Sequence, residues 1–117
     1  MNRNDRKIAK LDRKSDVDVF SKAVAEDVFR RVSDALNAQI QAGCDRVTLS
    51  VDLQTRAAEM LVFKQIIADV ARDAHSHFEK LMEGYRPPKH PSGRPVGVRV
   101  SPLRAGNVGM MTVSYTV

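Results

Sequence analysis

Apolar and polar residues alternate strictly from Arg46 to Asp52, with valine or leucine at every second position. This period of two is typical of a β-strand with one buried face. Without an intervening glycine or proline, the chain then enters a helical pattern that we expect to run from Gln54 to Glu83. A strand that leads directly into a helix is half of a β-α-β unit, and the rest of the chain is interpreted around this unit.

A first long helix is predicted upstream, from Ser15 as its N-cap to about Ala42, with Gly43 as its C-terminal stop. Its apolar residues recur at every fourth position, and they are Phe20, Val24, Val28, Val32, Leu36 and Ile40. Because four residues turn a helix by about 400°, this stripe drifts by about 40° at each step. We therefore expect the two ends of the stripe, at Phe20 and Ile40, to contact different neighbours.

Two further strands are predicted near the end of the chain, from Val96 to Ser101 and from Met110 to Val117. A turn at Leu103–Asn107 makes them a β-hairpin. The preceding segment, Tyr85–Pro95, contains four prolines and is expected to be extended. The sequence thus predicts an α+β fold in which two long helices pack on one face of a small three-stranded sheet. The order of elements is α-β-α-β-β, with a C-terminal β-hairpin.

The second predicted helix is longer than the sheet can cover. A helix of about 30 residues is about 45 Å long, whereas a strand of about seven residues spans about 23 Å. The C-terminal end of the helix should therefore overhang the sheet, and its apolar side chains need cover from the first helix or from a second copy of the chain. The residues predicted to form a protein interface are Leu61, Val62 and Ile66 on the helix flank and Phe78, Leu81 and Met82 on the overhang.

Charge is distributed unevenly, although the 117 residues carry a net charge of only +5. Residues 1–14 carry six basic and two acidic side chains, residues 15–84 carry eight and twelve, and residues 85–117 carry five basic side chains and no acidic one. Basic ends around an acidic middle predict either a polyanionic partner or contacts between the ends and the middle, within one subunit or between neighbours. The candidate polyanion-binding residues are Arg3, Arg6, Lys7, Lys10, Arg86, Lys89, Arg94 and Arg104.

Composition predicts a single globular domain. Hydrophobic residues make up 43% of the chain and charged residues 28%, which are ordinary values for such a domain. We assign residues 1–14 to a basic N-terminal arm and residues 15–117 to one α+β domain. The lone Cys44 excludes an internal disulfide, and the sequence shows neither a signal peptide nor an apolar run of about 20 residues. A cytoplasmic location without a membrane partner is therefore expected.

The sequence shows no pattern of catalytic residues. His75 and His77 lie two positions apart on a predicted helix, so they point in different directions, whereas zinc-binding helices space their ligands by three or four. Cys44 follows a predicted helix C-terminus, where the helix dipole disfavours a thiolate. The glycines do not form a phosphate-binding loop. We expect no enzymatic activity, no metal, no cofactor and no small-molecule substrate.

We expect instead a non-catalytic binding or assembly subunit that docks on a larger complex, such as a virion or an enzyme that it modulates, and that self-associates. Its partner would be another protein or a second copy of the chain. The alternative is a small basic DNA- or RNA-binding protein that uses the N-terminal arm and the basic proline-rich loop. Against this alternative, the sequence has no helix-turn-helix and no zinc-finger spacing.

Overall fold

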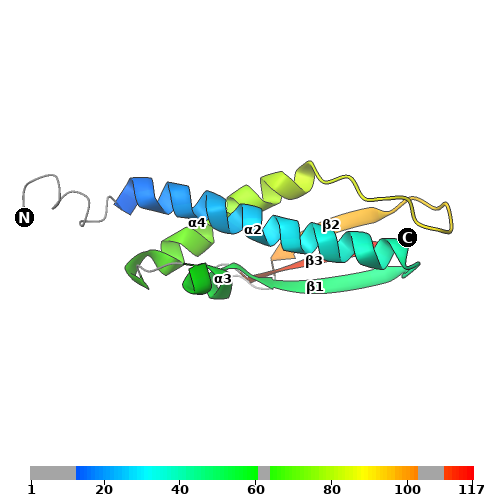
Figure 1. The fold of residues 1–117 in the computed structure, drawn as a ribbon, viewed down its shortest axis with the longest axis horizontal. Coiled ribbons are helices and arrows are strands. Elements are labelled where there is room, and N and C mark those ends of the chain that lie inside the picture. The colour runs from blue at the N-terminus through cyan, green and yellow to red at the C-terminus, as the bar shows by residue number, and fades with distance from the viewer. Residues whose placement is uncertain (1–12, 61–63, 103–109) are drawn as a thin grey trace, which may run out of the picture.

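The computed structural model describes residues 13–60, 64–102 and 110–117. Its helices are α2 (Arg13–Gln41), α3 (Leu53–Met60) and α4 (Ile67–Glu83), with a single 3₁₀ turn, η1 (Lys64–Ile66), before α4. Its strands are β1 (Arg46–Asp52), β2 (Gly97–Pro102) and β3 (Met110–Thr116), and they form a sheet in the order β1-β3-β2. The predicted α+β fold with a C-terminal hairpin is confirmed (Figure 1).

The last of these strands in the chain is the central strand of the sheet. β3 pairs antiparallel with both β1 and β2, so β1 and β2 run in the same direction. The helical segment between them makes a β-α-β connection whose two strands are separated by β3. Along the register, Leu49 is opposite Val113, which is opposite Val100. The apolar positions of all three strands therefore share one face of the sheet.

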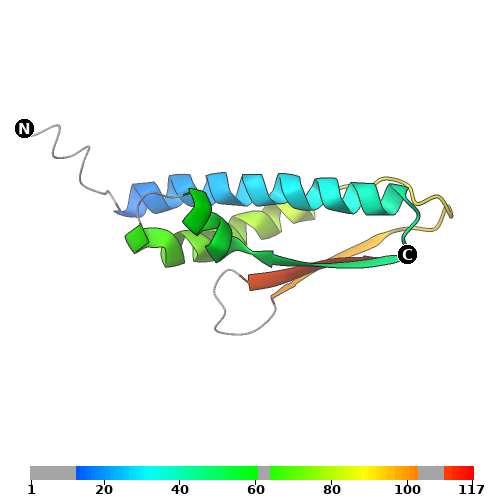
Figure 2. The ribbon, with the colours of Figure 1, turned by 60° about the horizontal axis from the view of Figure 1, so that its bottom comes forward.

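The helices cover that apolar face and leave the other face open (Figure 2). Met111, Val113 and Tyr115 on the central strand are almost completely buried. On the opposite face, the register aligns Thr48 with Ser114 and Arg99. This arrangement confirms the predicted alternation of buried and outward positions along the strands.

Helices α2 and α4 run side by side in the same direction (Figure 1). Small side chains lie in this part of the core, since Ser21, Ala25, Ala71 and Ala74 are fully buried. Such residues let two helix backbones approach closely. Over its length α2 contacts α3 and β1 as well as α4. These different neighbours agree with the changing direction of its apolar stripe.

The segment Gln54–Glu83 is not one helix, so that prediction is wrong: α3 ends at Met60 and α4 begins at Ile67. The physical reason is the direction in which α4 runs relative to β1. α4 runs back over the sheet opposite to β1, and a single straight helix that starts at the end of β1 cannot make this reversal. The break leaves α4 with 17 residues, about 26 Å. Its N-terminal half extends beyond the sheet (Figure 1), whereas the overhang was predicted at its C-terminal half.

Local signals fix the ends of α2 and α3. Gly43 adopts φ +90°, and the backbone N–H groups of Gly43 and Cys44 donate to the carbonyls of Ile40 and Gln39. This Schellman motif confirms the predicted stop. Asp52 caps α3, since its Oδ1 accepts the N–H of Thr55 at 2.9 Å. Ser15 lies inside α2 instead of capping it, because α2 already includes Arg13 and Lys14 from the predicted arm.

Candidate protein-binding groove

Strand β2 lies at one edge of the sheet. Its outer side has no strand partner among the described residues. Val98 and Val100 point to the helix-covered face but are only half-buried, whereas Val113 beside them on β3 is fully buried. An edge strand presents unpaired N–H and C=O groups that can bind another strand. β2 therefore offers both backbone groups and apolar side chains.

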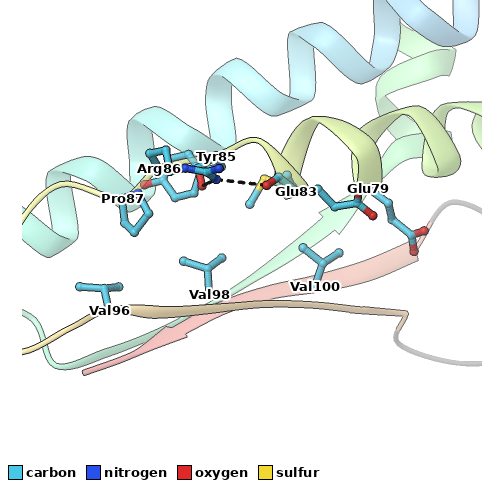
Figure 3. Close-up of a pocket in the computed structure, with 9 residues that line it drawn as sticks. Glu79, Glu83, Tyr85, Arg86, Pro87, Val96, Val98 and Val100 are labelled. Carbon is cyan, nitrogen blue, oxygen red and sulfur yellow. Dashed lines mark hydrogen bonds between the residues drawn. The ribbon is translucent and has the colours of Figure 1, made fainter.

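A groove of about 510 Å³ separates β2 from the C-terminal end of α4. Figure 3 shows three valines on the strand side and the last turns of α4 with the following residues on the other side. The apolar and aromatic lining residues are Met82, Tyr85, Pro87, Val96, Val98 and Val100. The charged lining residues are Glu79, Glu83 and Arg86.

The charges along this groove are ordered. In Figure 3, Arg86 lies toward the Val96 end, and the carboxylates of Glu83 and Glu79 lie toward the Val100 end. All three charged residues are exposed. Nη1 of Arg86 donates to the backbone carbonyls of Glu83 and Tyr85, at 3.3 and 3.2 Å, and so satisfies acceptors at the C-terminus of α4. The groove thus has a basic end and an acidic end.

Glu79 has one close neighbour on its own helix. Its Oε1 lies 3.0 Å from Nε2 of His75, and this nitrogen has no hydrogen-bond partner among the described residues. The Glu79 side chain is 47% exposed. Its carboxylate therefore remains accessible to a cation in the groove.

Buried His90 fixes the proline-rich segment that leads into β2. Its Nδ1 accepts the backbone N–H of Ser92 at 3.0 Å, so the proton of the neutral ring lies on Nε2. Nε2 then donates to the carbonyl of Cys44 at 3.2 Å. The hydroxyl of Tyr115 donates to the same carbonyl at 2.7 Å, and burial raises the pKa of Tyr115, which keeps this donor protonated. These bonds tie the segment to β3 and to the turn after α2.

Tyr85 fixes the other wall of the groove. Its hydroxyl donates to Oδ1 of Asn37 on α2, and its ring meets Phe29 edge to face with centroids 6.4 Å apart. Burial raises the pKa of Tyr85, so this hydroxyl also stays protonated. The start of the segment after α4 is therefore anchored to α2, which holds this wall of the groove in place.

The predicted protein-interface residues differ in their burial within the chain. Ile66 and Phe78 are fully buried and Met82 is 6% exposed. Ile66 and Phe78 are therefore core residues within the chain, and α2 packs along α4, the helix that carries Phe78. Leu81 is half-buried and packs against the same core, whereas Met82 reaches the groove. Leu61 and Val62 lie outside the described residues.

Three of the predicted polyanion-binding residues are described. Lys89 and Arg94 line one shallow pocket of about 280 Å³ on the proline-rich segment, whereas Arg86 lines the groove beside β2. Nη2 of Arg94 lies 3.9 Å from Oδ1 of Asp45, which offsets part of its charge. The other five predicted residues lie outside the described parts of the chain, and they are Arg3, Arg6, Lys7, Lys10 and Arg104.

The sequence reading missed the groove valines and Glu79 as binding residues. It placed Val98 and Val100 on the buried face, which is correct, but a buried strand face does not show which strand is at the edge. A signal was present in Pro95, two residues before β2, and in Pro102, its last residue. Proline cannot donate to a neighbouring strand and is therefore confined to edge strands and strand ends.

Within the described ranges, no three histidine, cysteine, aspartate or glutamate side chains are grouped so that they could hold a metal ion. None of the helices in these ranges is long and apolar enough to cross a bilayer. Comparison with protein-family models, with curated proteins and with solved structures finds no match to this chain. The groove is therefore interpreted from its own geometry.

Proposed function

We propose that the chain is a non-catalytic binding or assembly subunit that receives an extended segment of a protein partner along β2, from another protein or from a second copy of the chain. The larger partner would be a complex such as a virion, or an enzyme that the subunit modulates. The observation that carries this proposal is the open edge of β2 beside a groove lined with valines. In strand addition, the backbone supplies hydrogen bonds and a neighbouring groove takes every second side chain.

The groove also selects the sequence of the added segment. Its valines favour apolar residues at alternate positions, because successive side chains of a strand point to opposite faces. Glu79 and Glu83 favour a basic residue at the Val100 end, and Arg86 favours an acidic residue at the Val96 end. Pro95 and Pro102 limit the pairing to about the length of β2.

Selection from a random-peptide display library tests this proposal. The full chain would be compared with Val98→Lys, which places a charge in the groove, and with Thr48→Lys, which places the same charge on the open face of the sheet. We expect the unchanged chain and Thr48→Lys to enrich the same alternating apolar peptides. Val98→Lys should bind these peptides at least about tenfold more weakly, the loss expected for one disrupted anchor.

Thermal unfolding of the three proteins shows whether each is folded at the selection temperature. Should the Val98→Lys variant be unfolded there, Val98→Thr replaces it, because threonine keeps the shape and strand preference of valine. Recovery of the same peptides with equal affinity by the groove variant and the unchanged chain would overturn the proposal, as would recovery of none.

A second function is favoured by Lys89 and Arg94, which lie around the same pocket on the proline-rich segment. Two cations close together on a rigid loop suit phosphate groups, and nucleic acid is the corresponding partner. Binding to generic DNA and RNA across a salt series tests this alternative. Affinity should fall steeply with salt and should weaken in the Lys89→Gln/Arg94→Gln variant and on removal of residues 1–12. Absence of binding at low salt excludes it.

A further inference from the structure

We propose that the partner bound at this groove is a second copy of the chain. The β2 strands of the two copies pair antiparallel about a twofold axis beside Val100. The two sheets then join into one sheet of six strands. This inference rests on the proposed function, since it names the partner of the same edge. It is argued from strand geometry and from the order of charges along the groove.

Strand geometry restricts where the axis can lie. Directly opposite residues of an antiparallel pair point to the same face. The axis, which lies midway between the two strands, must therefore be level with one residue of β2 and not with the gap between two residues. An axis at Arg99 would place two guanidinium groups opposite each other on the open face, which is destabilising. An axis at Val100 instead places Arg99 opposite Ser101 of the second copy and joins the valines of both copies into one apolar strip.

The charges along the groove favour Val100 in particular. Figure 3 shows Val100 between Arg86 on one side and Glu79 on the other along the strand. A twofold axis beside Val100 exchanges the Arg86 side of one copy with the Glu79 side of the other. Arg86 of each copy then faces Glu79 of the other, and the contact occurs twice, as in any isologous interface. The charge order of the groove is thus complementary to its own reversed order.

Self-pairing also accounts for the open edge of β2. A second β2 covers the unpaired backbone groups and the half-buried Val98 and Val100 of both copies at once. Because each copy has only one β2, pairing at this edge stops at two chains. The exposed position of Arg86 and Glu79 means that their contacts chiefly set register and partner choice.

Sedimentation equilibrium of the full chain over micromolar concentrations tests the inference. We expect a reversible dimer. Glu79→Arg alone and Arg86→Glu alone each oppose like charges at both contacts, so each should weaken the dimer at least about tenfold, as close like charges do. An equimolar mixture of the two variants should restore the dimer, because every contact in the mixed dimer again joins a basic and an acidic side chain.

This rescue separates a lost contact from a damaged fold, since mixing does not repair a misfolded chain. Lys80→Glu is the matched control, because Lys80 is an exposed cation on α4 that does not line the groove. Its dimer should be unchanged. A cysteine at the axis gives an independent readout: in a Cys44→Ser background, Val100→Cys should form a disulfide between copies with oxidised glutathione faster than Thr48→Cys does.

A chain that is monomeric at the highest concentration overturns the inference. So does a dimer that neither charge reversal weakens, because its interface then lies elsewhere. In either case the peptide selection decides separately on the proposed function. Peptides that prefer the unchanged chain over Val98→Lys would keep the binding role of β2 with a different protein as partner.

Discussion

Asp27 on α2 accepts a hydrogen bond of 2.7 Å from Nε of Arg56 on α3, across 29 residues of sequence. The Asp27 side chain is 11% exposed and is also paired with Arg30 and Arg31 of its own helix, each at 3.0 Å. Arg56 makes a second ion pair with Glu59 at 2.7 Å. This cluster fastens α3 to α2 where the chain reverses between β1 and α4.

Asp27→Asn should destabilise the fold. The substitution removes the charge that three arginines share and leaves Arg56 without its partner on α2. Hydrogen bonds to a charged group contribute roughly 1.5–3 kcal/mol, so the free energy of unfolding in urea should fall by about this amount. Asp18→Asn is the control, because the Asp18–Lys22 pair is exposed on both sides and should change stability by less than about 0.5 kcal/mol. Equal effects of both substitutions would contradict the prediction.

The same carboxylate predicts a dependence on pH. The hydrogen bond from Arg56 is the main cause that lowers the pKa of folded Asp27 below 3.8, the ordinary value of an aspartate. The stability that Asp27 supplies is therefore complete above the unfolded pKa and is lost as the pH falls through the folded pKa. The unchanged chain and Asp27→Asn would be unfolded in urea at a series of pH values. The gap between their free energies of unfolding should be constant near neutrality and should narrow below about pH 4. A gap that widens in acid would refute this assignment.

His90→Phe should loosen the proline-rich segment. Phenylalanine fills a similar volume but leaves the N–H of Ser92 and one acceptor position of the Cys44 carbonyl without the ring nitrogens. Each hydrogen bond that is lost contributes roughly 0.5–1.5 kcal/mol. Hydrogen exchange should show faster exchange of the backbone amides of residues 92–94, and thermal unfolding should show a lower Tm. Lys89→Gln, at the exposed neighbouring position, should leave both measurements unchanged.

Gly43→Ala and Gly84→Ala should have opposite effects. Gly43 has φ +90°, and a Cβ there would meet only Pro91 at an ordinary 3.9 Å, so the cost of alanine comes from the backbone and amounts to about 1 kcal/mol. Gly84 has φ −86°, which alanine adopts freely, and its Cβ would lie 3.6 Å from the Leu81 carbonyl oxygen. Gly84→Ala should stabilise the chain by up to about 1 kcal/mol through the unfolded state. Urea unfolding of the two variants measures both effects.

The strands could be read from the sequence because alternation reports one buried face directly. Val47, Leu49 and Val51 on β1 show this pattern, and each takes the predicted side of the sheet. The break before Ile67 could not be read, because apolar residues continue across it at helical spacing and the cause is the reversal of direction relative to β1. Two kinds of cover were predicted for Ile66 and Phe78, the first helix or a second copy, and both side chains are buried in the core of the single chain.

The groove is formed by several elements together, so the pattern of a single element does not predict it. Val98 and Val100 read as core residues, and although the nearby prolines suggest an edge strand, the strand order is needed to show that β2 lies at an edge. Glu79 lies on the exposed side of its helix in any helical-wheel reading. It becomes part of a site only because α4 ends above β2 and the proline-rich segment carries Arg86 to the same groove.

The central position of β3 determines the order in which the sheet can form. Both pairings of the sheet use β3, and the register joins Arg46 to Thr116 across most of the sequence. During synthesis, α2, α3 and α4 can therefore pack together while β1 and β2 have no strand to bind. Such late, long-range pairing slows folding and exposes strand edges in the meantime. A ribosome-bound chain halted before residue 110 should consequently show protected helices and an unformed sheet.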